Sequence, residues 1–246
     1  MNKSIKRILI LTKRNLKEIL RDPLSLIFLI ALPLFMEILF YYLFHNLTTQ
    51  FEMKYLAPGI VAFSQAFLTL FTGLLISLDR NTSFLTRLYV TETKSYEFIF
   101  GYTLSLLPIT FIQSILFFLV GGIIDSSILS ISIIPTILLS IITSLFFIGL
   151  GILFGSICNE KSIGGVASIV ITAQSLLSAM WFPIEGLSED FIKVLNILPF
   201  KNSTMLLQNC LNNSGDIIKP ILIMIGYVIV VFVIAIFTFK DRMKSK

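Results

Sequence analysis

The sequence predicts an all-helical protein that crosses a membrane six times, and two observations support this fold class. The first is composition: of 246 residues, 56% are hydrophobic and 13% are charged, and the mean hydropathy is +0.92. Soluble domains carry roughly 25% charged residues, so this chain could not cover itself with a surface that faces water. The second is that the apolar residues form six long runs, which are typical of membrane-spanning helices. We therefore expect a single transmembrane domain over residues 1–246.

Residues 3–22 precede the first run and predict an amphipathic helix. On a helical wheel, cations occupy one arc and apolar side chains the opposite arc, with Ile10 and Leu11 as exceptions. The cations are Lys6, Arg7, Lys13, Arg14, Lys17 and Arg21, and the apolar residues are Ile5, Ile8, Leu9, Leu16, Ile19 and Leu20. Such a helix lies in the inner membrane interface with its cations toward anionic headgroups. The alternative is a basic flank that only fixes the orientation of the chain.

The first span follows this helix directly. Asp22 and Pro23 form a helix-start signal, because the carboxylate accepts hydrogen bonds from free amides and proline has no amide to satisfy. A helix of about 20 residues crosses a hydrocarbon layer of roughly 30 Å at about 1.5 Å per residue. A helix is required there because the bilayer offers backbone groups no water to bond. The six predicted spans are residues 24–44, 57–78, 98–121, 131–156, 163–182 and 220–239.

The positions of Lys and Arg predict the orientation. Of the 19 Lys and Arg residues, 15 lie in the N-terminal segment, the second and fourth connections and the C-terminal tail, which share one side of the membrane. Cytoplasmic segments carry this excess, so both termini are expected inside the cell, in a multi-pass protein of the cytoplasmic membrane. The net charge of +5 follows from this topology and indicates no nucleic-acid partner.

The connection between the second and third spans, residues 79–97, is expected to be a cytoplasmic loop with exposed apolar side chains. Thr82 or Ser83 could cap a short helix that continues to Tyr89. Apolar side chains that face water indicate a partner surface. The alternative is that they pack against the helix ends of the same chain.

The outer segment 183–218 predicts two short amphipathic helices between the fifth and sixth spans. One begins after Ser188 and ends before Pro199, and the other covers about 203–211. Both are too apolar for free solvent, so they should re-enter the outer leaflet or pack on the ends of the spans.

Taken together, these features resemble the permeases of type-2 ATP-binding-cassette (ABC) exporters over the whole chain. The resemblance rests on Arg21-Asp22-Pro23 and Pro33, on the stretch 181–185, on 198–200, and on the second connection, where the matching residues are Asp79, Arg80, Thr82, Leu88, Thr91 and Gly101. The chain departs from the usual pattern at Glu92, where proline is common, and at Tyr102, where lysine is common.

The resemblance implies a non-catalytic membrane subunit that works with a separate ATPase. No phosphate-binding G-x-x-x-x-G-K-[ST] loop occurs in the sequence, so ATP and Mg²⁺ would be bound by the partner, and no cofactor by this chain. The family assembles two permeases, identical or related, with two ATPases, and the interfacial "elbow" helix and the second connection contact the ATPase. The expected coupling residues are Asp79, Arg80, Thr82, Phe84, Leu85, Arg87, Leu88, Tyr89 and Thr91.

The resemblance also implies that cargo passes along the first, second and fifth spans at the interface of two permeases. The candidate residues are Glu37, Gln65, Thr69, Thr72, Gln174 and Ser178. Glu37 is either a cargo-facing or gating carboxyl group or a structural one bonded to Tyr41, His45 or another helix, since a charge in hydrocarbon is costly. Gln113 is expected to form an interhelical hydrogen bond. His45 has no neighbouring ligands in the sequence, so no metal site is expected.

The predicted function is the export of an amphipathic or lipophilic cargo, such as a peptide, a drug or a lipid-linked molecule. The alternative is a stand-alone carrier or a membrane assembly factor without an ATPase. A carrier would normally show inverted repeats and several buried ionisable groups. The first three and last three spans show no such repeat, and Glu37 is the one ionisable residue in the first span.

Overall fold

The computed structural model describes residues 3–82, 94–182 and 186–244. Within these ranges the chain is helical and contains no strand. The elements are α1 (Lys3–Leu20), α2 (Pro23–Leu26), the π-helical turn η1 (Ile27–Ala31), α3 (Leu32–Phe44), the 3-10 turn η2 (Thr49–Phe51), α4 (Met53–Gln65), α5 (Phe67–Asn81), α7 (Ser95–Ile124), the 3-10 turn η3 (Ser126–Ile128), α8 (Ile133–Ile157), α9 (Glu160–Leu177), α10 (Glu189–Leu195), α11 (Pro199–Asn212) and α12 (Ile218–Lys244).

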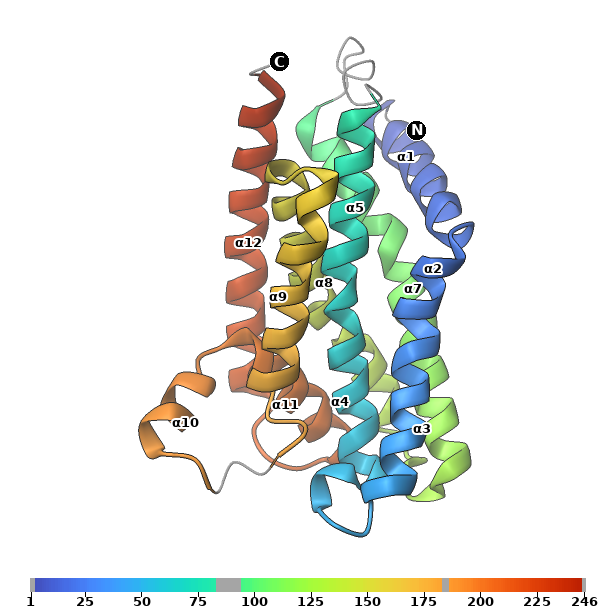
Figure 1. The fold of residues 1–246 in the computed structure, drawn as a ribbon, viewed down its shortest axis with the longest axis vertical. Coiled ribbons are helices and arrows are strands. Elements are labelled where there is room, and N and C mark those ends of the chain that lie inside the picture. Colours follow the sequence, from blue (N-terminus) through green and yellow to red (C-terminus); the bar gives the residue numbers. More distant parts are fainter. Residues whose placement is uncertain (1–2, 83–93, 183–185, 245–246) are drawn as a thin grey trace.

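The long helices run side by side in one bundle, with both ends of the chain at the same end of it (Figure 1). Helix α8 packs against α5, α7 and α12, and α1 packs against α7. The short helices α10 and α11 lie at the opposite end, together with the turn that joins α3 to α4 (Figure 1). The bundle therefore has one end that holds both termini and one that holds the predicted outer segment.

Five stretches of the described chain are long and apolar enough to cross a membrane: Pro23–Phe44, Met53–Asn81, Ser95–Ile124, Ile133–Ile157 and Ile218–Asp241. The predicted fifth span, 163–182, corresponds to α9, which is not among the five because polar residues such as Glu160, Lys161 and Gln174 lower its hydropathy. This helix also ends earlier than predicted, at Leu177, because Ala179 adopts a left-handed conformation with φ of 57°.

Helix α1 forms where the sequence predicts it, but it has three faces instead of two. Leu11, Asn15 and Ile19 are buried. Leu11 packs closely on Gly101 of α7, where an added Cβ would lie 2.8 Å from the Leu11 Cβ. Most of the predicted apolar arc stays exposed or half-buried on the chain. Leu11, which did not fit the two-arc pattern, thus belongs to the face that contacts the bundle.

The start of the first span follows the predicted cap. The Asp22 carboxylate accepts from the backbone N–H of Leu24 (3.1 Å) and from the Ser25 hydroxyl (2.5 Å), and Pro23 is the first helical residue. Further along, Pro33 follows the π-helical turn η1 and cannot donate to the Leu29 carbonyl.

Gln113 of α7 supplies a donor at that position. Its side-chain Nε2 donates to the Leu29 carbonyl, the acceptor that a proline at position 33 leaves without its α-helical partner. The predicted interhelical hydrogen bond of Gln113 is therefore confirmed.

Helices α5 and α8 approach each other through glycine. A Cβ added to Gly155 of α8 would lie 2.8 Å from the Gly73 carbonyl oxygen and 2.9 Å from its Cα. A Cβ on Gly151 would lie 2.5 Å from the Thr72 Cβ. Because these neighbours are backbone or Cβ atoms, any larger residue here would push the two helices apart.

The outer segment contains both predicted helices. Helix α10 begins after Ser188, as expected, whereas α11 is longer than expected because Pro199 occupies its first turn. Helix α11 packs against α4, α8, α9 and α12, so it is inserted among the span ends. It ends at Asn213, whose φ of 47° is left-handed.

Candidate functional site

Asp79 joins three helices at the end of the bundle that holds the termini. It lies in the last turn of α5 and is 1% exposed. Both of its carboxylate oxygens accept from the Arg14 guanidinium of α1 at 2.5 Å, and one also accepts from the Tyr102 hydroxyl of α7 at 2.6 Å. The expectation that Asp79 belongs to a solvent-facing loop is wrong, because the helix continues to Asn81 and the carboxylate faces the bundle.

The charges in this cluster explain its geometry. A buried carboxylate needs a cation and satisfied lone pairs, and a guanidinium provides two parallel donors. Burial alone would lower the pKa of Arg14, but its bonds to Asp79 raise the pKa, so the guanidinium stays charged. Tyr102 adds a neutral donor to Asp79, while the cation comes from Arg14 of α1.

Arg80 connects α5 to the end of α8. Its Nη1 donates to the carbonyl oxygens of Gly155 (2.8 Å) and Cys158 (3.1 Å). These carbonyls belong to the C-terminal end of α8, where backbone oxygens lack helical partners and a cation is favourable. Like Asp79, Arg80 lies in the helix and not in the loop where the sequence analysis placed it.

Glu97 connects the start of α7 to α1. Its carboxylate accepts from the backbone N–H of Lys94 (3.0 Å), which caps the helix, and from the hydroxyl of Ser4. Arg7 of α1 lies 3.6 Å from Oε2, the carboxylate oxygen that also accepts from Lys94. Together with the Arg14–Asp79–Tyr102 cluster, these contacts fix α1 along the end of α7 that lies near the termini.

Residues 83–93 join α5 to α7 in the sequence and lie outside the described residues, and the contacts above involve the described residues on either side of them. Thr82, the last described residue before them, closes α5, and its hydroxyl donates to the Asp79 carbonyl (3.4 Å). Six expected coupling residues lie outside the described residues: Phe84, Leu85, Arg87, Leu88, Tyr89 and Thr91. The described residues next to this connection thus contact α1, α7 and α8. A displacement of the connection would therefore act on these three helices and on α5.

The predicted pathway residues of the second span are buried within the protomer. The Gln65 side chain donates to the Ser140 carbonyl (2.9 Å) and accepts from the Thr143 hydroxyl (2.5 Å). The Thr69 hydroxyl donates to the Phe147 carbonyl (3.0 Å). Thr72 is fully buried against Gly151. These side chains hold α4 and α5 to α8 and do not face an open surface.

The candidates on α9 and α3 are buried as well. Gln174 donates to the Thr204 hydroxyl (3.2 Å), and Ser178 donates to the Ser175 carbonyl (3.4 Å). Glu37 is fully buried, and neither carboxyl oxygen has a hydrogen-bond partner among the described residues. The structural interpretation, in which Glu37 bonds to Tyr41, His45 or another helix, does not agree with this placement. All six candidate residues of the cargo pathway are buried within the protomer.

Comparison with known families decides which class of protein carries these features. The sequence model for the ABC-2 type transporter matches residues 6–211, from the second turn of α1 to the end of α11. The chain belongs to the ABC-2 type transporter family. A search of curated proteins finds no match. Within the described residues, no group of three or more His, Cys, Asp or Glu side chains could hold a metal ion.

For this ABC-2 permease, membership supports a membrane component without catalytic activity of its own, in a family that generally works with an ATPase subunit. The sequence analysis missed Arg14, Tyr102 and Glu97 as functional neighbours of the second connection. For Tyr102 a signal was present, because the resemblance described in the sequence analysis predicted lysine at its position. Arg14, in contrast, looks like any other cation of α1 until the fold brings α1 against α7.

Proposed function

We propose that this chain is the permease subunit of an ABC exporter in the cytoplasmic membrane, with both termini inside the cell. It moves an amphipathic or lipophilic cargo outward, and a separate ATPase subunit that binds ATP and Mg²⁺ drives the movement. The complex contains two permeases and two ATPases. Residues 83–93 and α1 form the docking surface for the ATPase.

The contacts around Asp79 and Arg80 are the observation on which this proposal rests. They join α1, α5, α7 and α8 through residues that closely precede the second connection in the sequence. A ligand can shift a conformational equilibrium only through contacts that differ between the two states. Nucleotide binding closes the ATPase pair, and the ties at this end pass that closure to the helices as a rigid-body rotation.

The second permease packs against α9. The exposed side of this helix carries small residues four apart, Gly164, Ser168 and Thr172, which allow close approach of a second helix in a membrane. A groove of about 440 Å³ runs along the same side, lined by Ser168, Ile169, Thr172, Ala173, Leu176 and Leu177. A mostly apolar groove with two hydroxyl groups fits a lipophilic cargo that carries few polar groups.

This groove replaces the buried positions as the proposed pathway. For Gln65 or Gln174 to face cargo, α4 would have to leave α8, or α9 would have to leave α11, and each separation would break buried hydrogen bonds. Thr172 is exposed already. Cysteine at position 172, with Cys158 and Cys210 replaced by serine, should cross-link two permeases, whereas cysteine at the buried position 167 should not.

Co-purification tests the ATPase partner. The tagged permease should retain a separately encoded ATPase. Changing Phe84, Leu88 and Tyr89 to aspartate should release it, because an unpaired carboxylate is costly to bury at a docking surface. Ile131→Asp is the matched control, since Ile131 is 86% exposed at the opposite end of the bundle. Retention that is equal in all variants, or no ATPase at all, would contradict the proposal.

A further inference from the structure

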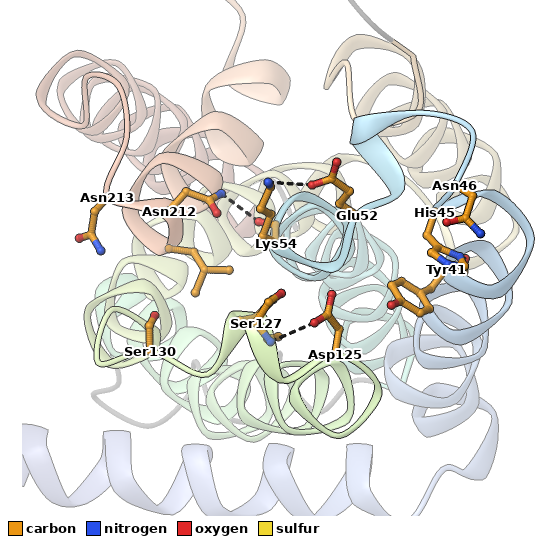
Figure 2. Close-up of a pocket in the computed structure, with 12 residues that line it drawn as sticks. Tyr41, His45, Asn46, Glu52, Lys54, Asp125, Ser127, Ser130, Asn212 and Asn213 are labelled. Carbon is orange, nitrogen blue, oxygen red and sulfur yellow. Dashed lines mark hydrogen bonds and ion pairs between the residues drawn. The ribbon is translucent and has the colours of Figure 1, made fainter.

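A cavity opens at the end of the bundle opposite the termini, apart from the two sites above. It has a volume of about 640 Å³. Figure 2 shows it between the end of α3, the start of α4, the connection from α7 to α8 and the end of α11. The lining residues are Tyr41, His45, Asn46, Glu52, Lys54, Asp125, Ser127, Ile128, Ser130, Leu211, Asn212 and Asn213. This volume suits a small molecule or a lipid headgroup.

The lining holds two acidic side chains, Glu52 and Asp125, and one lysine, Lys54. Glu52 and Lys54 form an ion pair at 2.7 Å, so their charges cancel. Asp125 accepts from the backbone N–H of Ser127 (2.9 Å) and caps the turn η3. Among the described residues, no Lys, Arg or His lies within ion-pair distance of Asp125. The carboxylates and the lysine of the lining therefore sum to a net negative charge.

Two further groups of the lining present acceptors. The Nδ1 of His45 lies 2.7 Å from the Tyr41 carbonyl, which can only accept, so Nδ1 carries the proton and Nε2 of the neutral ring is an acceptor. The Nδ2 of Asn212 donates to the carbonyls of Lys54 and Gln208, which leaves its Oδ1 as an acceptor. A positively charged donor therefore matches Asp125 and these two acceptors.

Glu37 adds a second acidic group beneath the cavity. Glu37, Tyr41 and His45 are four residues apart on α3 and share one face. A Cβ added to Gly121 would lie 3.0 Å from the Glu37 Oε1 and 2.9 Å from Ile128, which lines the cavity. Gly121 also lies one turn before Asp125. The buried carboxyl group without a partner is thus one helical turn below the cavity wall, and such groups in spans mark functional sites.

We propose that this cavity binds a molecule through a primary ammonium group. Asp125 is the counter-ion, and His45 Nε2 and Asn212 Oδ1 accept hydrogen bonds from the ligand, whose ammonium group has three donors. The ligand is either a soluble amine outside the cell or an aminophospholipid headgroup of the outer leaflet. The outward sidedness rests on the proposed function, whereas the binding itself does not.

The test uses two pairs of probes that differ in the same way. The purified full-length permease, without ATPase, is placed in phosphatidylcholine nanodiscs and titrated with ethanolamine or choline, and binding is followed by ligand-observed NMR. In a second arm, native mass spectrometry counts phosphatidylethanolamine and phosphatidylcholine retained from mixed nanodiscs. Ethanolamine and choline share a positive charge, but choline has no N–H donor.

Preference for ethanolamine in the first arm identifies a soluble amine, and preference for phosphatidylethanolamine in the second identifies a headgroup. In either case Asp125→Asn should weaken binding roughly tenfold or more, because a hydrogen bond to a charged group is lost. Asparagine can still cap η3, so the fold is retained. Asp216→Asn is the control, since Asp216 caps the start of α12 at the same end, outside the cavity (2.8 Å to the Ile218 N–H).

No preference in both arms, or equal binding by the Asp125→Asn variant, would overturn the proposal. Because no ATPase is present, this failure is distinct from loss of the ATPase partner, which co-purification reports separately.

Discussion

The contact between Arg14 and Asp79 should contribute measurably to the stability of the bundle, and a double-mutant cycle can isolate it. The perturbations are Arg14→Met, which keeps the aliphatic stem, and Asp79→Asn, which keeps the size of the side chain and its bond from Tyr102. Each single variant leaves one partner of the pair in place, and the double variant removes both. The coupling energy of the cycle therefore reports the interaction of the Arg14 guanidinium with the charge of Asp79, and the separate ion pair of Arg14 with Glu18 cancels in the cycle.

The magnitude follows from burial. Breaking a buried ion pair costs about 3–5 kcal/mol, and hydrogen bonds to charged groups contribute roughly 1.5–3 kcal/mol each. The Asp79 side chain is 2% exposed, but that of Arg14 is 33% exposed, so water compensates part of the loss. We expect a coupling energy of about 2–3 kcal/mol, just below the range for a fully buried pair.

The assay is a denaturant titration of the purified permease in detergent. Fluorescence of Trp181, the one tryptophan of the chain, reports unfolding, with circular dichroism as a second probe of the same transition. The control pair is Asp190–Lys193, which has a distance of 2.9 Å but side chains that are 93% and 70% exposed. Such a surface pair should show no measurable coupling. A coupling energy for Arg14–Asp79 below about 0.5 kcal/mol would refute the reasoning.

Three further predictions use the same titration. Gly155→Leu should destabilise the permease by at least about 1–3 kcal/mol through overpacking against α5, whereas Gly226→Leu, with no atom within 4 Å of an added Cβ, should not. Gln113→Leu should cost about 1 kcal/mol, because the Leu29 carbonyl loses its donor from α7; an unchanged midpoint would contradict this. Arg80→Met should lower stability by about 1–2 kcal/mol through loss of two bonds to the end of α8, and a neutral result would show that water replaces them.

Local signals predicted the ends of several elements correctly. The cap of Asp22 and Pro23 at the first span and the start of α10 after Ser188 depend on residues within one turn, so sequence alone determines them. The early end of α9 was not predictable in this way. Ala179 takes a left-handed conformation that no glycine or asparagine signals, and Met180 beyond it is buried by packing from other helices.

The site was predicted less well than the fold, for a physical reason. Hydropathy places Gln65, Thr69 and Gln174 within spans, but it does not say which neighbouring helix each one faces. A polar side chain in a span satisfies the same energetic rule whether it bonds a neighbouring helix or lines a wet pathway. Asp79 illustrates the same limit, because its burial depends on Arg14, which is 65 residues away in the sequence.

The central proposal is that a cytosolic ATPase binds the connection between α5 and α7. A photo-reactive amino acid at position 88, introduced into the permease in cells that also make the ATPase, tests this most directly. We predict a covalent adduct with the ATPase after irradiation, and none from the same amino acid at position 131, at the other end of the bundle. An adduct missing at position 88, or formed equally at position 131, would contradict the account.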